Sequence, residues 1–456
     1  MSRVNGPELL FLSKPSPLLI ELRSSLLREK YVKNLPIRGP FPPEMPAARF
    51  PAPQLASLKG DPEDIARQLQ HLKGLVFFDS AGNLPANHRP PVSIIAARPE
   101  KILKGHISDH QALQEEIARR STSGHDSGFP TGAACGWVDY DGTYTFGIYP
   151  ELLIYHHQTN QWWETGSLST QLKTPAISTP SWGGWQPSLE KNDYIAAVAR
   201  AKEYIAAGDI YQVNLSRKIH APCTAPDGLF SLYENLRTSS PAPLASYLNL
   251  AGREVLSSSP ETFLSISGKE IETRPIKGTR PRFADPELDS RSAFDLRQSE
   301  KETAELVMIT DLLRNDIGQV CEFGSVQVTD MLRLEKLQHV HHLVSTIRGT
   351  LRENISHLDA LAACFPGGSI TGAPKKRATE IITELEPGSR GLYTGAIGYL
   401  GFNGESQFNI AIRTLIHEKG QLAYHVGAGI VADSDPAAEF EETEHKARGV
   451  RMALAR

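Results

Sequence analysis

One lysine of this chain lies in a segment where its positive charge is unfavourable. The segment RPIKGTRPR, residues 274–282, places Lys277 between two prolines and close to three arginines. Neighbouring positive charge and removal from water both disfavour an ammonium group, so together they can lower the pKa of a lysine. A neutral amine is a nucleophile, whereas an ammonium is not. The segment therefore indicates either a nucleophilic lysine or an ordinary surface lysine in a basic loop.

Two pairs of glutamates have the spacing of a metal-binding helix face. Glu302 and Glu305 are three residues apart, as are Glu439 and Glu442, so each pair would share one face of a helix. Four carboxylates provide hard oxygen ligands for Mg²⁺. The bound ion would keep some of its water and could also bind an anionic substrate. Because ExxE is a common pattern, either pair taken alone is more simply interpreted as solvated surface glutamates.

Three further side chains have both a structural and a chemical interpretation. Arg413, in the strand-like run FNIAIRTLI, would either form a buried ion pair or clamp a carboxylate. His342 is either a hydrogen-bonded core histidine or an acid/base group that titrates near neutrality. Glu261 either caps a turn or acts as a general acid. None of the three is decided by its own residues.

Two glycine-rich segments could bind an anion through backbone N–H groups. They are FPGGSITGAPKKR and the GAG at residues 427–429, and exposed N–H groups of such turns can hold an anion. The first segment lacks the Lys and Ser or Thr that complete a P-loop. Tight turns required by packing are the simpler interpretation of both segments.

Composition restricts the class of protein and its partners. The chain has 456 residues, of which 40% are hydrophobic and 22% charged, as in ordinary globular proteins. A net charge of -4 indicates neither nucleic-acid nor membrane-surface binding. The apolar run near the N-terminus is too short for a secretory signal or a membrane span. We therefore expect a cytoplasmic protein with small molecules or proteins as partners.

The four cysteines do not form a recognisable reactive pattern. Cys135, Cys223, Cys321 and Cys364 are far apart in the sequence. The absence of a C-x-x-C pair argues against a zinc site or a disulfide framework, and reduced core thiols are the better interpretation. Their sequence contexts also lack a nucleophile elbow.

The elements that must position these residues favour one large mixed fold. Residues 1–60 are proline-rich and read as an extended arm, and a low-order stretch ending near Ser188 separates residues 61–187 from residues 188–456. Strand-like runs alternate with helices expected at 299–315, 356–364, 374–385 and 435–456. Asp435 and Pro436 are a suitable N-cap and first residue for the last helix. This order predicts an α+β fold with large, mostly antiparallel sheets.

Taken together and in order, the motifs resemble the chorismate-utilising enzymes, a family that includes anthranilate, aminodeoxychorismate, isochorismate and salicylate synthases. The motifs are YQVNLSR, SSSPETFL, RPIKGTRPR, ELVMITDLLRNDIGQV, VHHLVSTIRG, FPGGSITGAPKKRA, GAIGYLGF, IAIRT and GAGIVADSDPAAEFEET. The resemblance is strong from about residue 188 to 446 and weak from about 65 to 165. It implies a two-lobed α+β structure with large antiparallel sheets around one site.

Two positions within the resemblance indicate the nucleophile. Hydroxylating members carry a water-activating lysine where this chain has Gln212, and anthranilate synthases typically have PIAGTRPRG. PIKGT, with Lys277, resembles component I of aminodeoxychorismate synthase. The resemblance implies that Lys277 attacks C2 of chorismate while the C4 hydroxyl leaves, and that ammonia then attacks C4 and releases the lysine. The implied product is 4-amino-4-deoxychorismate, for 4-aminobenzoate and folate synthesis.

The resemblance also implies a role for each remaining candidate. Glu261 matches the general acid at the departing hydroxyl, His342 matches a histidine beside the reacting ring, and the cofactor is Mg²⁺. The implied metal site has Glu305 and Glu442 closest to the ion, with Glu302 and Glu439 holding its waters. The implied carboxylate-binding positions are Arg413, Tyr393, Ser369, Lys446 and the backbone near Gly427 and Gly429.

The source of ammonia and two alternative functions complete the expectations. Because no cysteine context resembles an amidotransferase, glutamine-dependent activity requires a separate glutamine amidotransferase subunit as partner. ELVM replaces the family's usual EHLM or ENLM after Glu305, which removes a polar side chain beside the metal pair. The alternatives are anthranilate synthase component I, against which Lys277 argues, and a chorismate-binding pseudoenzyme without turnover.

Overall fold

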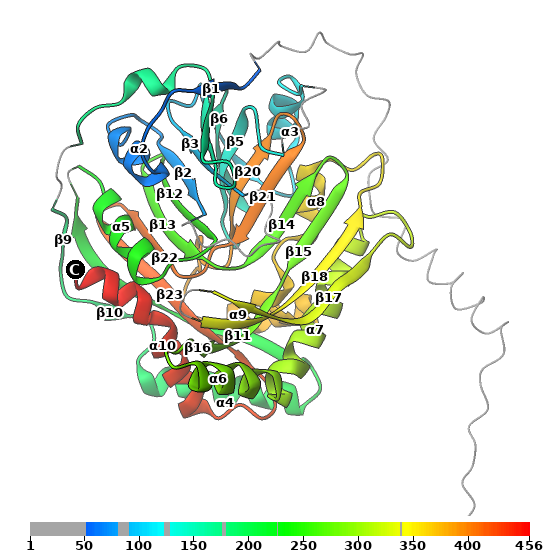
Figure 1. Cartoon of the computed structure of the whole chain (residues 1–456). Helices are drawn as coiled ribbons and strands as arrows, with labels where there is room; N and C mark the ends of the chain where they lie inside the picture. The colour runs from blue at the N-terminus through cyan, green and yellow to red at the C-terminus, as the bar shows by residue number, and fades with distance from the viewer. Residues whose placement is uncertain (1–51, 81–90, 123–127, 176–178, 226, 338–339) are drawn as a thin grey trace, which may run out of the picture. The chain divides into compact units, whose positions relative to one another are not determined.

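The structure is a computed structural model that describes residues 52–80, 91–122, 128–175, 179–225, 227–337 and 340–456. The described residues belong to one compact unit, residues 47–456. Most of the predicted proline-rich arm, residues 1–51, lies outside the described residues. Within the compact unit, two large antiparallel sheets are accompanied by helices (Figure 1), which confirms the predicted α+β class.

The larger sheet has thirteen strands. Its main path runs β1 (Gln54–Ala56), β8 (Gln161–Thr165), β7 (Leu152–His156), β3 (Val92–Ala96), β2 (Val76–Asp79), β12 (Leu244–Leu250), β13 (Arg253–Ser259), β22 (Thr414–Glu418), β23 (Gln421–Ile430), β11 (Gln212–Thr224) and β10 (Gln186–Pro187). Two short strands, β9 (Ser181–Trp182) and β19 (Gly372–Ala373), also pair with β11.

The second sheet has ten strands. Its main path runs β16 (Ile276–Pro281), β18 (Val340–Thr350), β15 (Glu270–Arg274), β14 (Thr262–Ser267), β21 (Glu405–Ile410), β20 (Ala396–Gly401), β5 (Ala133–Val138), β6 (Thr143–Tyr149) and β4 (Lys101–His106), and β17 (Gln327–Lys336) also pairs with β18. Both sheets contain strands from before and after Ser188. The boundary near Ser188 therefore divides the sequence but not the sheets.

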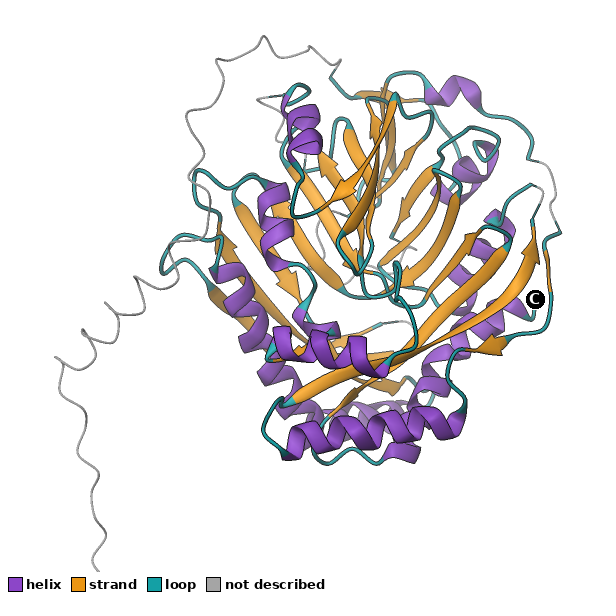
Figure 2. Cartoon of the chain, turned by 180° about the vertical axis from the view of Figure 1, so that it is seen from behind, coloured by secondary structure: helices purple, strands orange, loops and turns teal. Residues whose placement is uncertain are grey.

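Helices cover the outer sides of both sheets (Figure 1, Figure 2). Those that pack on the larger sheet are α2 (Pro62–Gln68), α4 (Lys191–Ala206), α5 (Phe230–Ser239), α9 (Lys375–Leu385) and α10 (Pro436–Leu454). Those on the smaller sheet are α3 (Gln111–Ala118), α6 (Pro286–Arg297), α7 (Glu300–Gly318) and α8 (His357–Cys364). The short 3₁₀ helices are η1 (Leu168–Gln171) and η2 (Gly368–Ile370). No helix in the described ranges is long and apolar enough to cross a membrane.

Caps place the site helices where the sequence predicts them. The side chain of Ser299 accepts a hydrogen bond from Glu302 N before α7, and Asp435 accepts one from Ala438 N before α10. Pro436 occupies the first turn of α10, where its missing N–H costs nothing. Each ExxE pair therefore lies within one regular helix, as predicted.

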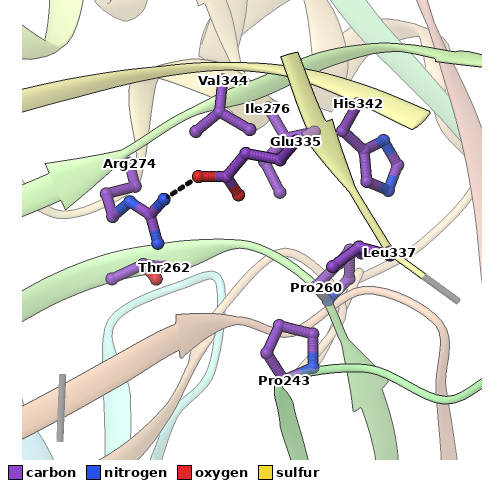
Figure 3. Close-up of a pocket in the computed structure, with 9 residues that line it drawn as sticks. All are labelled: Pro243, Pro260, Thr262, Arg274, Ile276, Glu335, Leu337, His342 and Val344. Carbon is purple, nitrogen blue, oxygen red and sulfur yellow. Dashed lines mark hydrogen bonds and ion pairs between the residues drawn. The ribbon is translucent and has the colours of Figure 1, made fainter. Parts of the chain in front are cut away.

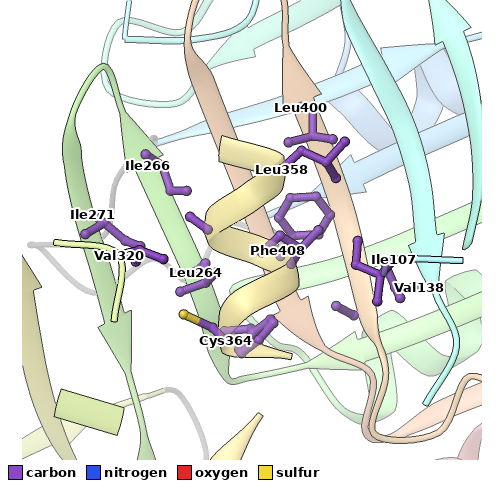
Figure 4. Close-up of a cluster of buried hydrophobic side chains, with 14 of the residues drawn as sticks. Ile107, Val138, Leu264, Ile266, Ile271, Val320, Leu358, Cys364, Leu400 and Phe408 are labelled. Carbon is purple, nitrogen blue, oxygen red and sulfur yellow. The ribbon is translucent and has the colours of Figure 1, made fainter. Parts of the chain in front are cut away.

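The core follows the alternation of side chains along the strands. In β5, Trp137 faces the larger sheet and packs in a cluster with Ile94 and Leu248, whereas Val138 faces away from that sheet. Successive strand residues point to opposite faces, so one strand supplies both layers. On the outer face, α8 places Leu358 and Cys364 in the cluster that also holds Leu264 and Phe408 (Figure 4). The two sheets thus share one apolar layer, and helices bury the second face of the smaller sheet.

Candidate active site

Two candidate residues lie where the chain passes from one sheet to the other. Glu261 follows Pro260 in the connection between β13 and β14, and Arg413 lies in the connection between β21 and β22. The connections are joined to neighbouring strands by hydrogen bonds from Ile410 N to Glu261 O (3.1 Å) and from Ser258 N to Arg413 O (3.1 Å). The sheets therefore meet at both residues.

The prediction of a single strand through FNIAIRTLI is wrong. The strand β21 ends at Ile410 in the smaller sheet, and β22 begins at Thr414 in the larger one. Arg413 has a φ of 50°, a left-handed conformation that interrupts a strand. An apolar run that changes sheets has the same composition as one that stays in a sheet, which is why the sequence did not reveal the break.

A β-bulge sets the direction of Lys277. The register between β16 and β18 shifts between Lys277 and Thr279, and the intervening Gly278 has a φ of 68°. Bulges of this kind re-aim a side chain. The Lys277 ammonium donates a hydrogen bond to Glu305 Oε1 at 2.6 Å, and the Gln212 amide Nε2 donates to the same oxygen at 2.6 Å. The lysine thus lies between β16 and α7, against a buried carboxylate.

The expected lowering of the Lys277 pKa is wrong. Burial lowers the pKa of Lys277, but the negative charges of Glu305, Glu261 and Glu442 outweigh burial and raise the pKa above its usual value. Each neighbouring arginine has an acidic partner of its own, which offsets its positive charge. Arg274 pairs with Glu335, Arg280 with Glu302, and Arg282 with Asp289.

Glu261 is a buried carboxyl surrounded by positive charge. Burial raises its pKa, while a hydrogen bond from Ser369 and the charges of Lys277, Lys446 and Arg413 oppose that rise. The net pKa is raised, which favours a protonated carboxyl that can donate a proton. Four of the predicted site residues, Ser369, Lys277, Lys446 and Arg413, therefore act on the Glu261 carboxyl.

Glu442 forms the second carboxylate centre of the site. Its Oε1 lies 2.7 Å from the Lys446 ammonium, which also donates a hydrogen bond to Gly427 O at 3.0 Å. Burial and the charge of Glu305 raise the pKa of Glu442, but Lys446 and Lys301 together outweigh them and hold the pKa below its usual value. The charges of Glu305 and Glu442 therefore act on each other, although they lie on different helices.

The outer members of the two pairs have other partners. Glu439 accepts a hydrogen bond from Ser434 Oγ at 2.6 Å and lies 3.5 Å from the Lys301 ammonium. Glu302 lies 3.5 Å from Arg280 Nη1. Within the described ranges, no three acidic, histidine or cysteine side chains are close enough to hold a metal ion together. The inner pair still offers the right donor chemistry, because two repelling carboxylates, each neutralised by a lysine, would also be neutralised by a divalent cation.

His342 is a neutral histidine in this site. Its Nδ1 lies 3.0 Å from Thr279 Oγ1 and 3.3 Å from Gly278 O, while its buried Nε2 has no hydrogen-bond partner among the described residues. Burial and the charge of Arg413 lower the pKa of His342 to about 4. Titration near neutrality, one of the two interpretations of this residue, is therefore wrong. A bond from Nδ1–H to Gly278 O leaves Nε2 as an acceptor.

A small pocket lies beside His342 (Figure 3). Arg274 and Glu335 form an ion pair along one side, and Pro243 and Pro260 form another side. This pocket adjoins the connection that carries Glu261.

Two glycines of β23 lie against polar side chains of the site. Strand β22 pairs with β23 only up to Tyr424, whereas β11 pairs with β23 up to Ile430. Among the described strands, residues 427–429 therefore have one unpaired backbone edge, as the predicted anion binding requires. A Cβ at Gly427 would lie 2.8 Å from Tyr393 Oη, and one at Gly429 would lie 2.6 Å from Gln212 Nε2. Both glycines allow polar side chains to approach the strand closely.

Other residues of the site were not found by sequence reasoning. His425 stacks on Tyr393 with ring centroids 4.9 Å apart, and Asn214 Oδ1 is a buried acceptor without a partner in the described part of the chain. Arg390 lies behind Tyr393, over whose ring its guanidinium packs. The only signal was a charged or polar residue within a strand or turn segment, which is too common to use alone.

All four cysteines are free and buried. Burial raises the pKa of each thiol, to about 11 for Cys321. This confirms the interpretation as core thiols, because a buried thiol with a raised pKa is a poor nucleophile.

Comparison with known proteins places these residues among homologues. The family model described as chorismate binding enzyme matches residues 88–452. Anthranilate synthase component 1 of Streptomyces coelicolor is 48% identical over 274 residues, 60% of this chain and 53% of that protein. Aminodeoxychorismate synthase component 1 is 39% identical over 332 residues in Bacillus subtilis and 42% identical over 322 residues in Escherichia coli. Both alignments cover 68% of this chain and 70% of the relative. The chain thus spans about half of the first relative and a larger share of the other two.

Solved structures show the same fold. Anthranilate synthase component I of Streptococcus pneumoniae TIGR4 superposes with a TM-score of 0.70 at 29% identity, covering 80% of this chain and 93% of that one. The menaquinone-specific isochorismate synthase of Escherichia coli superposes with a TM-score of 0.71 at 17% identity, covering 96% of this chain and 99% of that one. At that identity the second likeness concerns the fold alone.

Proposed function

The chain belongs to the chorismate binding enzyme family, and from this premise we propose that it aminates chorismate to 4-amino-4-deoxychorismate. The ammonia comes from a glutamine amidotransferase subunit, and the product serves 4-aminobenzoate and folate synthesis. Relatives named as anthranilate synthases and as aminodeoxychorismate synthases are both similar to this chain, so their names do not decide between the two reactions. The observation that carries the proposal is Lys277, whose ammonium is turned into the carboxylate cluster of the site.

In the proposed reaction, Lys277 is a nucleophile and Glu261 is a general acid. The neutral amine forms a bond to C2 of chorismate as the ring double bonds shift and the C4 hydroxyl leaves as water, with a proton from Glu261. Ammonia then forms a bond to C4, the double bonds shift back, and the bond to Lys277 breaks. Because the pKa of Lys277 is raised, its ammonium must lose a proton before the amine can act as a nucleophile.

The remaining candidates bind and orient the substrate in this proposal. Within the described part of the chain, the guanidinium of Arg413 has no hydrogen-bond or ion-pair partner, and burial lowers its pKa, so a substrate carboxylate would supply the missing charge. Tyr393, Ser369, Lys446 and the backbone of Gly427 and Gly429 are the other proposed carboxylate contacts. His342 lies beside the ring with Nε2 as an acceptor.

Mg²⁺ is the proposed cofactor. Glu305 and Glu442 would hold the ion, and Glu302 and Glu439 would hold its waters; once bound, it would polarise the ring carboxylate of the substrate. Lys277 and Lys446 occupy the inner carboxylates in this structure, so their ammonium groups would have to move aside.

A separate amidotransferase is the proposed partner because this chain offers no suitable thiol. All four cysteines are buried, with raised pKa values. A cytoplasmic location and the absence of nucleic-acid and membrane partners stay predictions.

Product analysis tests the proposal. Purified protein is incubated with chorismate, Mg²⁺ and ammonium at mildly alkaline pH, and the products are separated by chromatography and identified by mass spectrometry. Wild type is compared with Lys277→Ala and with Lys269→Ala, a lysine that pairs with Glu353 on the surface. We expect 4-amino-4-deoxychorismate without pyruvate, lost in Lys277→Ala and retained in Lys269→Ala.

Two outcomes would replace the proposal. Anthranilate with pyruvate would identify an anthranilate synthase component I, the alternative that the relative at 48% identity favours. Intact chorismate would favour a binding protein without turnover.

A further inference from the structure

A buried ion pair lies next to Tyr393 of the site. The side chains of Arg390 and Glu386 are 1% and 7% exposed. Their contact is bidentate, with Nε donating to Oε2 at 2.8 Å and Nη2 donating to Oε1 at 2.6 Å. Such a planar fork fixes both groups in one orientation. Neither residue has a role in the proposed chemistry.

The remaining donors of Arg390 reach three separate segments of the chain. Nη1 donates to Ile370 O and to Thr394 Oγ1, each at 3.2 Å, and Nη2 donates to Asn214 O at 2.7 Å. Ile370 and Thr394 directly follow Ser369 and Tyr393. Asn214 lies on β11 opposite Gly429 of β23. The Arg390 guanidinium therefore forms hydrogen bonds with the immediate neighbours of Ser369, Tyr393 and Gly429, three positions proposed to bind the substrate's carboxylates.

Glu386 extends the same connection along β11. It accepts hydrogen bonds from Ser216 N at 2.7 Å and Ser216 Oγ at 3.0 Å, and Ser216 lies opposite Gly427. Arg390 also packs over the rings of Tyr140 and Tyr393, at 4.7 Å and 5.7 Å from their centroids. The pair thus supports β11 through hydrogen bonds and Tyr393 through packing on its ring.

We propose that Arg390, held by Glu386, is a positioning residue that sets the spacing between Ser369, Tyr393 and the Gly427–Gly429 backbone. It does not touch the substrate. A lysine would keep the charge but could not make five directed hydrogen bonds from one plane. Replacement should therefore spread these segments and weaken chorismate binding, in addition to any loss of stability. This inference rests on the proposed function.

The test compares Arg390→Lys with a matched change at Arg237. Arg237 is a partly buried arginine with acidic partners, Asp79 at 2.5 Å and Glu63 at 2.8 Å, and within the described ranges these partners lie outside the site segments. For both variants and wild type, Kd for chorismate is measured by calorimetry, kcat and KM with saturating ammonium, and Tm by differential scanning. All binding and rate measurements are made well below the lowest Tm.

We expect Arg390→Lys to raise Kd and KM for chorismate at least tenfold, while Arg237→Lys lowers Tm but changes both by less than about twofold. Glu386→Gln should shift Kd in the same direction, because it removes the fork that orients Arg390. Unchanged Kd and KM in Arg390→Lys would overturn the positioning role alone, as would equal losses in Arg237→Lys. Failure of wild type to bind chorismate would overturn the proposed function together with this inference.

Discussion

Replacing Gly429 by alanine tests the contact between β23 and the nucleophile's carboxylate partner. A Cβ at this position would lie 2.6 Å from Gln212 Nε2 and 3.0 Å from Glu305 Oε1. Both distances are shorter than an ordinary contact, so the amide and the carboxylate must each shift away from the added methyl group. The 2.6 Å hydrogen bond between them would break, and the Lys277 ammonium on the same oxygen would be displaced.

The expected loss follows from the kind of bond that is broken. A hydrogen bond to a charged group contributes about 1.5–3 kcal/mol, and overpacking costs a similar amount, about 1–3 kcal/mol. If about 1.5–3 kcal/mol of transition-state stabilisation is lost, kcat/KM falls about 10- to 150-fold, since each 1.36 kcal/mol is tenfold. The loss should appear in kcat/KM for chorismate with ammonium.

Gly318→Ala is the matched control. Gly318 ends α7, is exposed, and has no atom within 4 Å of an added Cβ. Alanine also favours helix over glycine, so this variant should keep wild-type kcat/KM and stability. A folded Gly429→Ala protein whose kcat/KM is within about twofold of wild type would refute the proposed coupling of Gln212, Glu305 and Lys277.

Three other measurements test the site and the core. Because the raised pKa of Lys277 keeps its amine protonated at neutrality, kcat/KM at a fixed concentration of free ammonia should rise from pH 7 to 9; a flat profile contradicts a nucleophilic Lys277. Burial lowers the pKa of His425 to about 3 in the folded protein, below the unfolded value of about 6.5. As the pH falls below about 6.5, the unfolded state therefore binds more protons at this residue than the folded state does. Between pH 7 and 5, the free energy of unfolding of His425→Phe should therefore fall by about 2 kcal/mol less than that of wild type, as measured by urea unfolding. Equal falls in the two proteins would contradict a contribution from His425. The four buried cysteines should not react with a thiol reagent in the native protein and should all react after denaturation.

Local chemistry made several parts of the site predictable. The helices α7 and α10 begin directly after their N-caps, Ser299 and Asp435, because the capping side chains lie in the same short segment as the N–H groups they bind. Their ExxE pairs follow from helix geometry alone. The buried cysteines and the α+β class likewise depend on composition and on the order of elements.

The charge state of Lys277 was not predictable from its neighbours. Its three nearby arginines each pair with an acidic residue, and the partner of the lysine itself, Glu305, is 28 positions away in the sequence. Similarly, the neutral state of His342 depends on burial and on Arg413, which lies in the connection between β21 and β22. A pKa depends on distances in space, and the sequence supplies only distances along the chain.

The residue types, their order, the helices that carry the carboxylates and the family resemblance all follow from the sequence alone. Only the tertiary structure decided that FNIAIRTLI divides between two sheets, that a bulge aims Lys277 at Glu305, and that Arg390 connects three site segments. The physical reason is the range of the interactions. Caps and helix periodicity act over a few residues, whereas sheet pairing, burial and ion pairs join residues that are distant in the chain and exist only once the fold has formed.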